Sequence, residues 1–315
     1  MSTTPTTSAS KLAASSALAN RRGMFALAGA MAVFSINDML VKLTAQRYPL
    51  GEIITVRGVI ATALVGAVLA RFGHAVMLRG ALHRLVIGRT LLDGAAMLLF
   101  ISALVHMPLA NISAINLVSP LMITALAVVF FAEDVGWRRW TAIVVGFIGV
   151  LFIVKPTQDS FNAWALLGVG CAFAGASRDV ITRKLDPGIS TVVISFMAAL
   201  GSTLIGAVMG LWEDWRAMAL ADIGMLAMAA ALLAAGHFFV VIAFRGVDVA
   251  AIAPFRYTLL IWAGLCGYIA FGEVPDGPAI FGALLIVVSG LYALHREVVR
   301  RRTLTAAVPP GEPGV

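Results

Sequence analysis

Eight ionisable side chains interrupt long apolar stretches of this sequence, in places where charge is rare. An ionisable group at membrane depth costs several kcal/mol unless it is paired or hydrated, so such groups mark ligand sites, ion pathways or structural ion pairs. The chemistry open to them is the binding of charged groups and the movement of protons. They are Asp38, Arg57, Arg89, Asp93, Arg178, Asp179, His237 and Arg256.

Arg256 is the strongest candidate for contact with a ligand. It lies roughly 12 Å from the nearer end of its apolar stretch, at 1.5 Å per residue, and Tyr257 follows it. A shift of 140 residues aligns Arg256 with Asn116 in the first half of the chain. We expect Arg256 to hold the negative group of a ligand, with Tyr257 and Asn116 beside it. The alternative is a buried ion pair with Asp93 or Asp179.

His237, Asp93 and Asn37 complete the predicted ligand-binding set. His237 could bind the ligand or move a proton; alternatively its ring packs and bonds to a backbone carbonyl. Asp93 lies four residues after Arg89, a spacing that allows the two side chains to pair along one helix face.

Asp38, Arg57, Arg89 and Asp179 are candidates for ion coupling or for structural ion pairs. Asp38 with Arg57 could join the first two apolar stretches. Asp179 points about 100° away from Arg178 on a helix, and we expect Arg178 to extend to the membrane interface.

Ten apolar segments must position these residues. Of the 315 residues, 60% are hydrophobic and 12% charged, whereas a soluble domain carries about 25% charged residues. About 20 apolar residues in a helix cross the hydrocarbon core. The sequence therefore predicts an all-α integral membrane protein with ten transmembrane helices, at 24–43, 51–70, 87–106, 109–131, 138–154, 161–183, 189–212, 222–244, 248–271 and 278–295.

The chain also contains an internal repeat. Shifts of 140 and 142 residues align two halves of five helices each, and an odd number of helices forces the halves into opposite orientations. Inverted repeats are common in transporters, whose binding site lies where the repeats meet. The aligned residues include Ala110, Ile112, Phe131 and Glu133 with Ala250, Ile252, Phe271 and Glu273, and Lys42 with Lys184.

Four regions follow from these patterns. Residues 1–20 are predicted to be a disordered N-terminal tail, 21–157 the first repeat, 158–297 the second repeat, and 298–315 a basic, disordered C-terminal tail. Glu133 and Glu273 lie at helix–loop junctions, where capping or turn roles are expected.

The distribution of basic residues predicts the orientation. Fifteen of the Lys and Arg residues lie on the side of both termini and four lie on the opposite side. The positive-inside rule then places both termini in the cytoplasm of a bacterium, with the helices in its inner membrane. The net charge of +7 follows from this distribution, and we expect no nucleic-acid partner.

Two segments resemble the EamA family of the drug/metabolite transporter superfamily. They are SPLMITALAVVFFAEDVGWRRWTAIVVGFIGVLFIVKP and APFRYTLLIWAGLCGYIAFGEVPDGPAIFGALLIVVSGLYAL. The resemblance covers nearly the whole chain between the tails, with one departure: Pro120 precedes Glu133 by thirteen residues, but Leu260 occupies the matching position, and a proline stands earlier, at Pro254. It implies a central cavity lined by spans one, three, four, six, eight and nine, with spans five and ten at the periphery.

The expected function is secondary transport of a small organic metabolite by alternating access. Charges of both signs indicate an anionic or zwitterionic substrate, and the resemblance implies one like an amino acid, S-adenosylmethionine or riboflavin. The alternatives are an exporter of the same fold, a passive channel or an intramembrane enzyme. We expect no enzyme activity, cofactor or metal, because H-E-x-x-H, G-x-S-x-G and Gly-rich phosphate motifs are missing. Proton coupling, and a monomer or a homodimer, stay open.

Overall fold

The computed structural model describes residues 6–71, 80–131, 136–155, 162–186, 188–244 and 252–307, and within these ranges it is helical without a strand. The elements are α1 (Thr6–Ala45), α2 (Leu50–Arg71), α3 (Arg84–His106), α4 (Leu109–Asn116), α5 (Ser119–Phe131), α6 (Trp137–Val154), α7 (Ala163–Thr182), α8 (Thr191–Gly210), α9 (Leu220–Phe244), η2 (Ala253–Thr258), α11 (Leu259–Phe271) and α12 (Gly277–Ala307).

The predicted membrane fold is confirmed. Nine helical stretches of the described chain are long and apolar enough to cross a bilayer, and α4 with α5 forms one of them, Leu109–Phe131. The remaining predicted span, the ninth at 248–271, corresponds to η2 followed by α11, and its first residues, 248–251, lie outside the described ranges. Observed and predicted ends agree within a few residues because the length of apolar sequence sets both.

Both predicted tails differ from the structure. Helix α1 begins at Thr6 and α12 continues to Ala307, so parts of 1–20 and of 298–315 are helical. Adding residues to an existing helix avoids the cost of nucleation, and the Ala-rich 12–19 stretch propagates a helix well. We had read the same composition as disorder because it has no apolar face.

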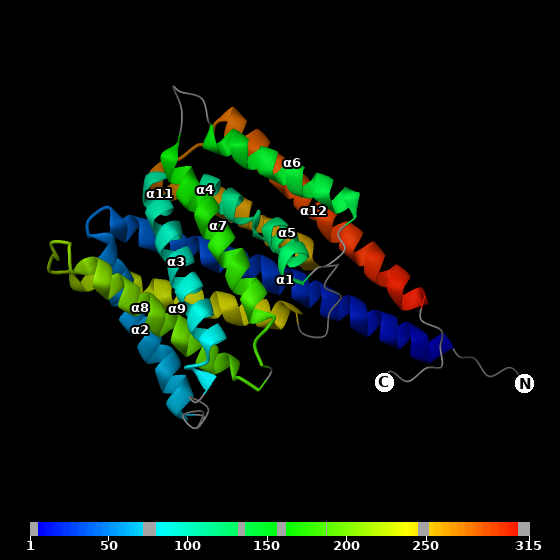
Figure 1. Cartoon of the computed structure of the whole chain (residues 1–315), viewed down its shortest axis with the longest axis horizontal. Coiled ribbons are helices and arrows are strands. Elements are labelled where there is room, and N and C mark those ends of the chain that lie inside the picture. The colour runs from blue at the N-terminus through cyan, green and yellow to red at the C-terminus, as the bar shows by residue number, and fades with distance from the viewer. Residues whose placement is uncertain are drawn as a thin grey trace, which may run out of the picture.

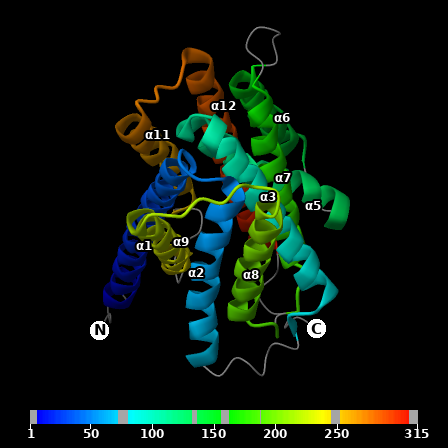
Figure 2. The same ribbon diagram turned by 90° about the vertical axis from the view of Figure 1, so that its left-hand side faces the viewer.

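Helix packing follows the internal repeat (Figures 1 and 2). Helix α1 packs on α9, and the equivalent helices α7 and α3 pack on each other; α2 packs on its equivalent α8, and α6 on α12. Exchanging the two halves exchanges these contacts, so the halves are related by a pseudo-twofold arrangement. The start of α1 and the end of α12 lie at the same end of the bundle (Figure 1).

The α6–α12 pair lies to one side of the bundle (Figure 1). The two backbones approach closely, since a Cβ added at Gly149 would lie 2.7 Å from the carbonyl oxygen of Gly282. Small residues permit such contact between membrane helices. This position agrees with the peripheral place expected for spans five and ten.

The fourth and ninth spans are interrupted at equivalent positions. Helix α4 ends at Asn116 and α5 begins at Ser119, where Pro120 cannot donate a helix hydrogen bond. In the ninth span, Pro254 stands in the first turn of η2, a 3₁₀ helix that leads into α11. Interrupted helices at the repeat interface expose backbone and side-chain polar groups in the bundle interior.

Candidate functional site

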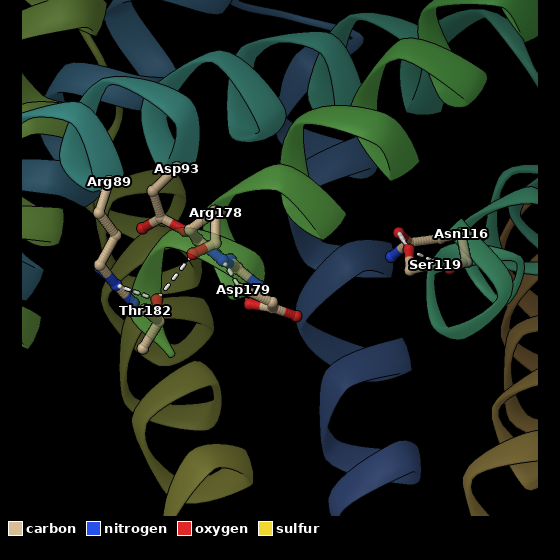
Figure 3. Close-up of polar contacts among 7 residues, drawn as sticks. All are labelled: Arg89, Asp93, Asn116, Ser119, Arg178, Asp179 and Thr182. Atoms are coloured by element: carbon tan, nitrogen blue, oxygen red, sulfur yellow. Dashed lines mark hydrogen bonds and ion pairs between the residues drawn. The ribbon is translucent and has the colours of Figure 1, made fainter. Parts of the chain in front are cut away.

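Arg178 is the centre of an ion-pair cluster between α3 and α7 (Figure 3). Its Nη1 lies 2.5 Å from Asp93 Oδ1, and its Nε donates to Asp179 Oδ1 at 2.9 Å. Arg89 Nε donates to the Thr182 hydroxyl at 3.1 Å. Two helices from different repeats are thus joined by one guanidinium.

Two expectations about this cluster were wrong. Asp93 is paired with Arg178 and not with Arg89, because α7 packs directly on α3 and brings a guanidinium from the neighbouring helix to the carboxylate. For the same reason Arg178 turns inward and does not extend to the interface. Asp93 still attracts Arg89 electrostatically, and Arg89 Nη1 is buried without a hydrogen-bond partner in the described part of the chain.

A second polar group lies on α1 and α2. The buried Asn37 side chain donates to Asp38 Oδ1 at 2.8 Å and accepts a weak hydrogen bond from Arg57 Nη1 at 3.5 Å. Asp38 and Arg57 also attract each other. The predicted link between the first two spans is present, and Asn37 mediates it.

Arg256 lies in η2, which packs on α1, α11 and α12. The residue is exposed, and among the described residues it forms no ion pair with Asp93 or Asp179. The charges of Asp179 and Arg178 act on it, so it belongs to the same electrostatic environment. The predicted alternative of a buried structural pair for Arg256 is not what the structure contains.

Asn116 and Ser119 occupy the break in the fourth span. Ser119 Oγ donates to the Asn116 carbonyl oxygen at 2.7 Å and contacts Asn116 Oδ1 at 3.3 Å. In Figure 3 the Asn116 side chain points toward the side of α7 on which Asp179 lies. The break therefore presents an amide toward the charged cluster.

Tyr257 and His237 lie apart from this region. Tyr257 is buried, and its hydroxyl fills the space beside Gly290 of α12, where a Cβ could not fit. His237 Nδ1 lies 2.8 Å from the Leu233 carbonyl oxygen, and its ring meets Phe34 edge-on at 5.2 Å. Tyr257 thus packs toward α12. His237 bonds to a backbone carbonyl, as in the alternative expected for it, but the residue is exposed.

The charges at membrane depth do not cancel. Four arginines, Arg57, Arg89, Arg178 and Arg256, accompany three aspartates, Asp38, Asp93 and Asp179. The aspartates are engaged by Arg57 and Arg178, which leaves Arg256 as the exposed positive charge of the set. Such an arrangement can bind an anionic group. In the described residues no group of three or more His, Cys, Asp or Glu could hold a metal ion.

Sequence reasoning missed the pairing of Lys42 with Glu273, which lies 2.5 Å away. Glu273 had been assigned a capping role, and it does accept a hydrogen bond from Leu109 N at the start of α4. Glu133, the equivalent residue of the first repeat, lies outside the described residues. The repeat alignment of Lys42 with Lys184 was the signal that could have identified the lysine.

Comparisons with known proteins agree with this architecture. Residues 21–155 match the model of the EamA-like transporter family. An S-adenosylmethionine uptake transporter of Rickettsia felis is 30% identical over 192 residues, which are 60% of this chain and 64% of the relative. The pseudopaline exporter CntI of Pseudomonas aeruginosa is 28% identical over 81% of this chain and 90% of its own length. A riboflavin transporter of Vibrio cholerae is 30% identical over 60% of this chain and 63% of the relative.

The first of these matches spans just under two thirds of the relative's own length. A crystal structure of a protein with 16% sequence identity superposes with a TM-score of 0.59, over 89% of this chain and 98% of the other. That likeness supports the fold alone. The first repeat of the chain, residues 21–155, thus matches the EamA-like transporter family, and the similarity to a transporter of known function extends into the second repeat.

Proposed function

We propose that the chain is a secondary transporter that moves a small organic metabolite across the bacterial inner membrane by alternating access. The substrate carries a negative group, either as an anion or within a zwitterion, and Arg256 binds that group. Compounds that share the chemistry of S-adenosylmethionine, riboflavin or amino acids are the first to test. Uptake is the direction we favour, and export by the same fold is the alternative, since one relative is a pseudopaline exporter.

One observation carries this proposal: the exposed guanidinium of Arg256 stands in the interrupted ninth span and forms no ion pair among the described residues. A fixed pore needs no such inverted pair of halves with interrupted helices, whereas a carrier that rocks around a central site does. An intramembrane enzyme would need a nucleophile with a base or a set of metal ligands, and the cluster around Arg178 consists of guanidinium and carboxylate groups with one threonine hydroxyl. The geometry therefore supports binding and transport over catalysis.

The functional test combines ligand binding with exchange. The melting temperature of the purified protein is measured in the presence of single compounds from a panel of metabolites. A compound that binds the folded state stabilises it by RT ln(1 + [L]/Kd), and the apparent melting temperature rises. A stabilising compound is then tested in proteoliposomes that have been preloaded with the same compound in unlabelled form. We expect entry of the labelled compound to be accelerated by the internal pool and to saturate. Entry without exchange stimulation would contradict a carrier.

The orientation gives a second expected result. Gly136 and Asp276 are both exposed and occupy equivalent positions of the two repeats. In a background with Cys171→Ser and Cys266→Ser, we expect Gly136→Cys to react with an impermeant maleimide only from the cytoplasmic side, and Asp276→Cys only from the periplasmic side. Reaction of both from one side would refute the inverted arrangement.

A further inference from the structure

A buried ion pair joins the two repeats at the end of the bundle where α1 ends and α2 begins. Lys42 of α1 is 6% exposed. Its ammonium group lies 2.5 Å from Glu273 Oε1 and also donates to the Met107 carbonyl oxygen, at the end of α3. The lysine belongs to the first repeat and the glutamate to the second.

The glutamate is held in place from several directions. Gly272 ends α11 in the left-handed region, at φ 65°, which favours glycine, and Glu273 N donates to the Gly267 carbonyl oxygen at 3.1 Å. The second carboxylate oxygen, Oε2, accepts a hydrogen bond from Leu109 N at 2.8 Å. One carboxylate therefore ties the end of α11 to α1 and to the start of α4.

Further polar contacts join the repeats at the same end. Asp222 accepts hydrogen bonds from Arg47 Nη1 at 3.0 Å and from the Tyr48 hydroxyl at 2.8 Å. Glu52 accepts one from Arg216 N at 3.0 Å. In each case one partner lies in the α1–α2 region and the other in the α8–α9 region, so this end of the bundle is closed by contacts between the repeats.

Lys184, the equivalent lysine of the second repeat, differs from Lys42 in its burial. Lys42 Nζ lies 5.0 Å from the centre of the Phe271 ring, and Lys184 Nζ lies 5.0 Å from that of Phe131, so the two lysines occupy matching positions. Lys184 is exposed, whereas Lys42 is buried. The pseudo-symmetry of the fold is therefore broken at these two lysines.

From this difference we infer that Lys42 and Glu273 form a latch that closes the binding region on the periplasmic side, and that the structure represents the state with this latch shut. The inference rests on the proposed transport function. An ion pair in a low-dielectric interior opens only when both charges are rehydrated, and here opening must also separate Glu273 from α4. The separation moves α11 against α1 and α4, which is the relative motion of repeats that alternating access requires.

The test measures access to the interior from the periplasmic side. Asn116→Cys is introduced as the sole cysteine, with Cys171→Ser and Cys266→Ser, and its reaction rate with an impermeant maleimide is measured in right-side-out vesicles without substrate. We expect Glu273→Gln or Lys42→Gln to raise this rate at least tenfold. The double variant should react no faster than either single variant, because each removes the same latch.

Two matched controls separate a latch from general loosening. Asp276→Asn removes the ion pair of Lys155 with Asp276, which lies at the same end of the bundle but joins α6 to α12. Lys184→Gln removes the equivalent lysine at the other end. Neither should change the rate of Asn116→Cys labelling from outside.

An unchanged rate in Glu273→Gln, with the variant eluting as a folded monodisperse protein, would overturn the latch. Equal acceleration by Lys184→Gln would do so as well. The measurement uses no substrate, so a failed search for a transported compound would weaken the proposed function without changing this result. Conversely, a functional carrier with an unaltered labelling rate would remove only the latch.

Discussion

Arg256→Ala is expected to reduce exchange of the identified substrate by roughly 10- to 100-fold at subsaturating concentration. Arg256 is exposed, forms no ion pair among the described residues and lies in the electrostatic field of Asp179. A hydrogen bond to a charged group contributes about 1.5–3 kcal/mol, and each 1.4 kcal/mol is about tenfold in affinity. Initial rates of counterflow in proteoliposomes provide the measurement.

The stability of this variant is the control. Because Arg256 is not engaged by a carboxylate, its removal strands no buried charge, and we expect the apparent melting temperature without ligand to stay close to that of the parent protein. Arg256→Lys should restore part of the exchange, since it keeps the charge but loses the two-pronged geometry of the guanidinium. Full exchange by Arg256→Ala would exclude this residue from the site.

The limits of sequence reasoning differ between backbone and side chains. The ten spans were predictable because crossing a bilayer requires about 20 apolar residues, and the repeat was visible as matching positions such as Phe131 and Phe271. The break after Asn116 also has a local cause, Pro120. These features depend on composition and short-range geometry, which a sequence displays directly.

The ion pairs were not predictable in the same way. Glu273 is 231 positions from Lys42, and Asp93 is 85 positions from Arg178, so only the packing of helices from different repeats brings them together. Spacing along a single helix instead favoured Arg89 for Asp93. Several carboxylates at membrane depth could pair with each guanidinium, and the spacing of residues along one helix does not show which of them does.

Tyr257 shows a related limit. It follows Arg256 directly, and the sequence predicts both side chains beside the ligand. The segment is a 3₁₀ helix, with about 3.0 instead of 3.6 residues per turn, so successive side chains diverge by about 120°. Tyr257 consequently packs toward Gly290, while Arg256 stays exposed. Successive side chains also diverge by about 100° on an α-helix, so adjacency in the sequence does not place two side chains on one face.

Arg178→Met, unlike Arg256→Ala, is expected to lower the stability of the folded protein. Arg178 alone joins Asp93 and Asp179, and these two carboxylates would be left at membrane depth without their cation. Removing one partner of a fully buried ion pair costs about 3–5 kcal/mol; the side chains of this cluster are 20–42% exposed, so the expected cost lies below that range. We expect a clearly lower apparent melting temperature and a smaller yield of monodisperse protein in detergent.

Replacing the two unpaired aspartates with asparagines distinguishes unpaired charge from a simple loss of side-chain packing as the cause of the lower stability. The triple variant Asp93→Asn, Arg178→Met, Asp179→Asn should recover most of the stability, because no unpaired charge remains in it. If the triple variant is as unstable as Arg178→Met, the cluster acts through side-chain packing and not through charge. Recovery of stability without recovery of exchange would show that the same ion pairs also shape the electrostatic environment in which Arg256 meets its ligand.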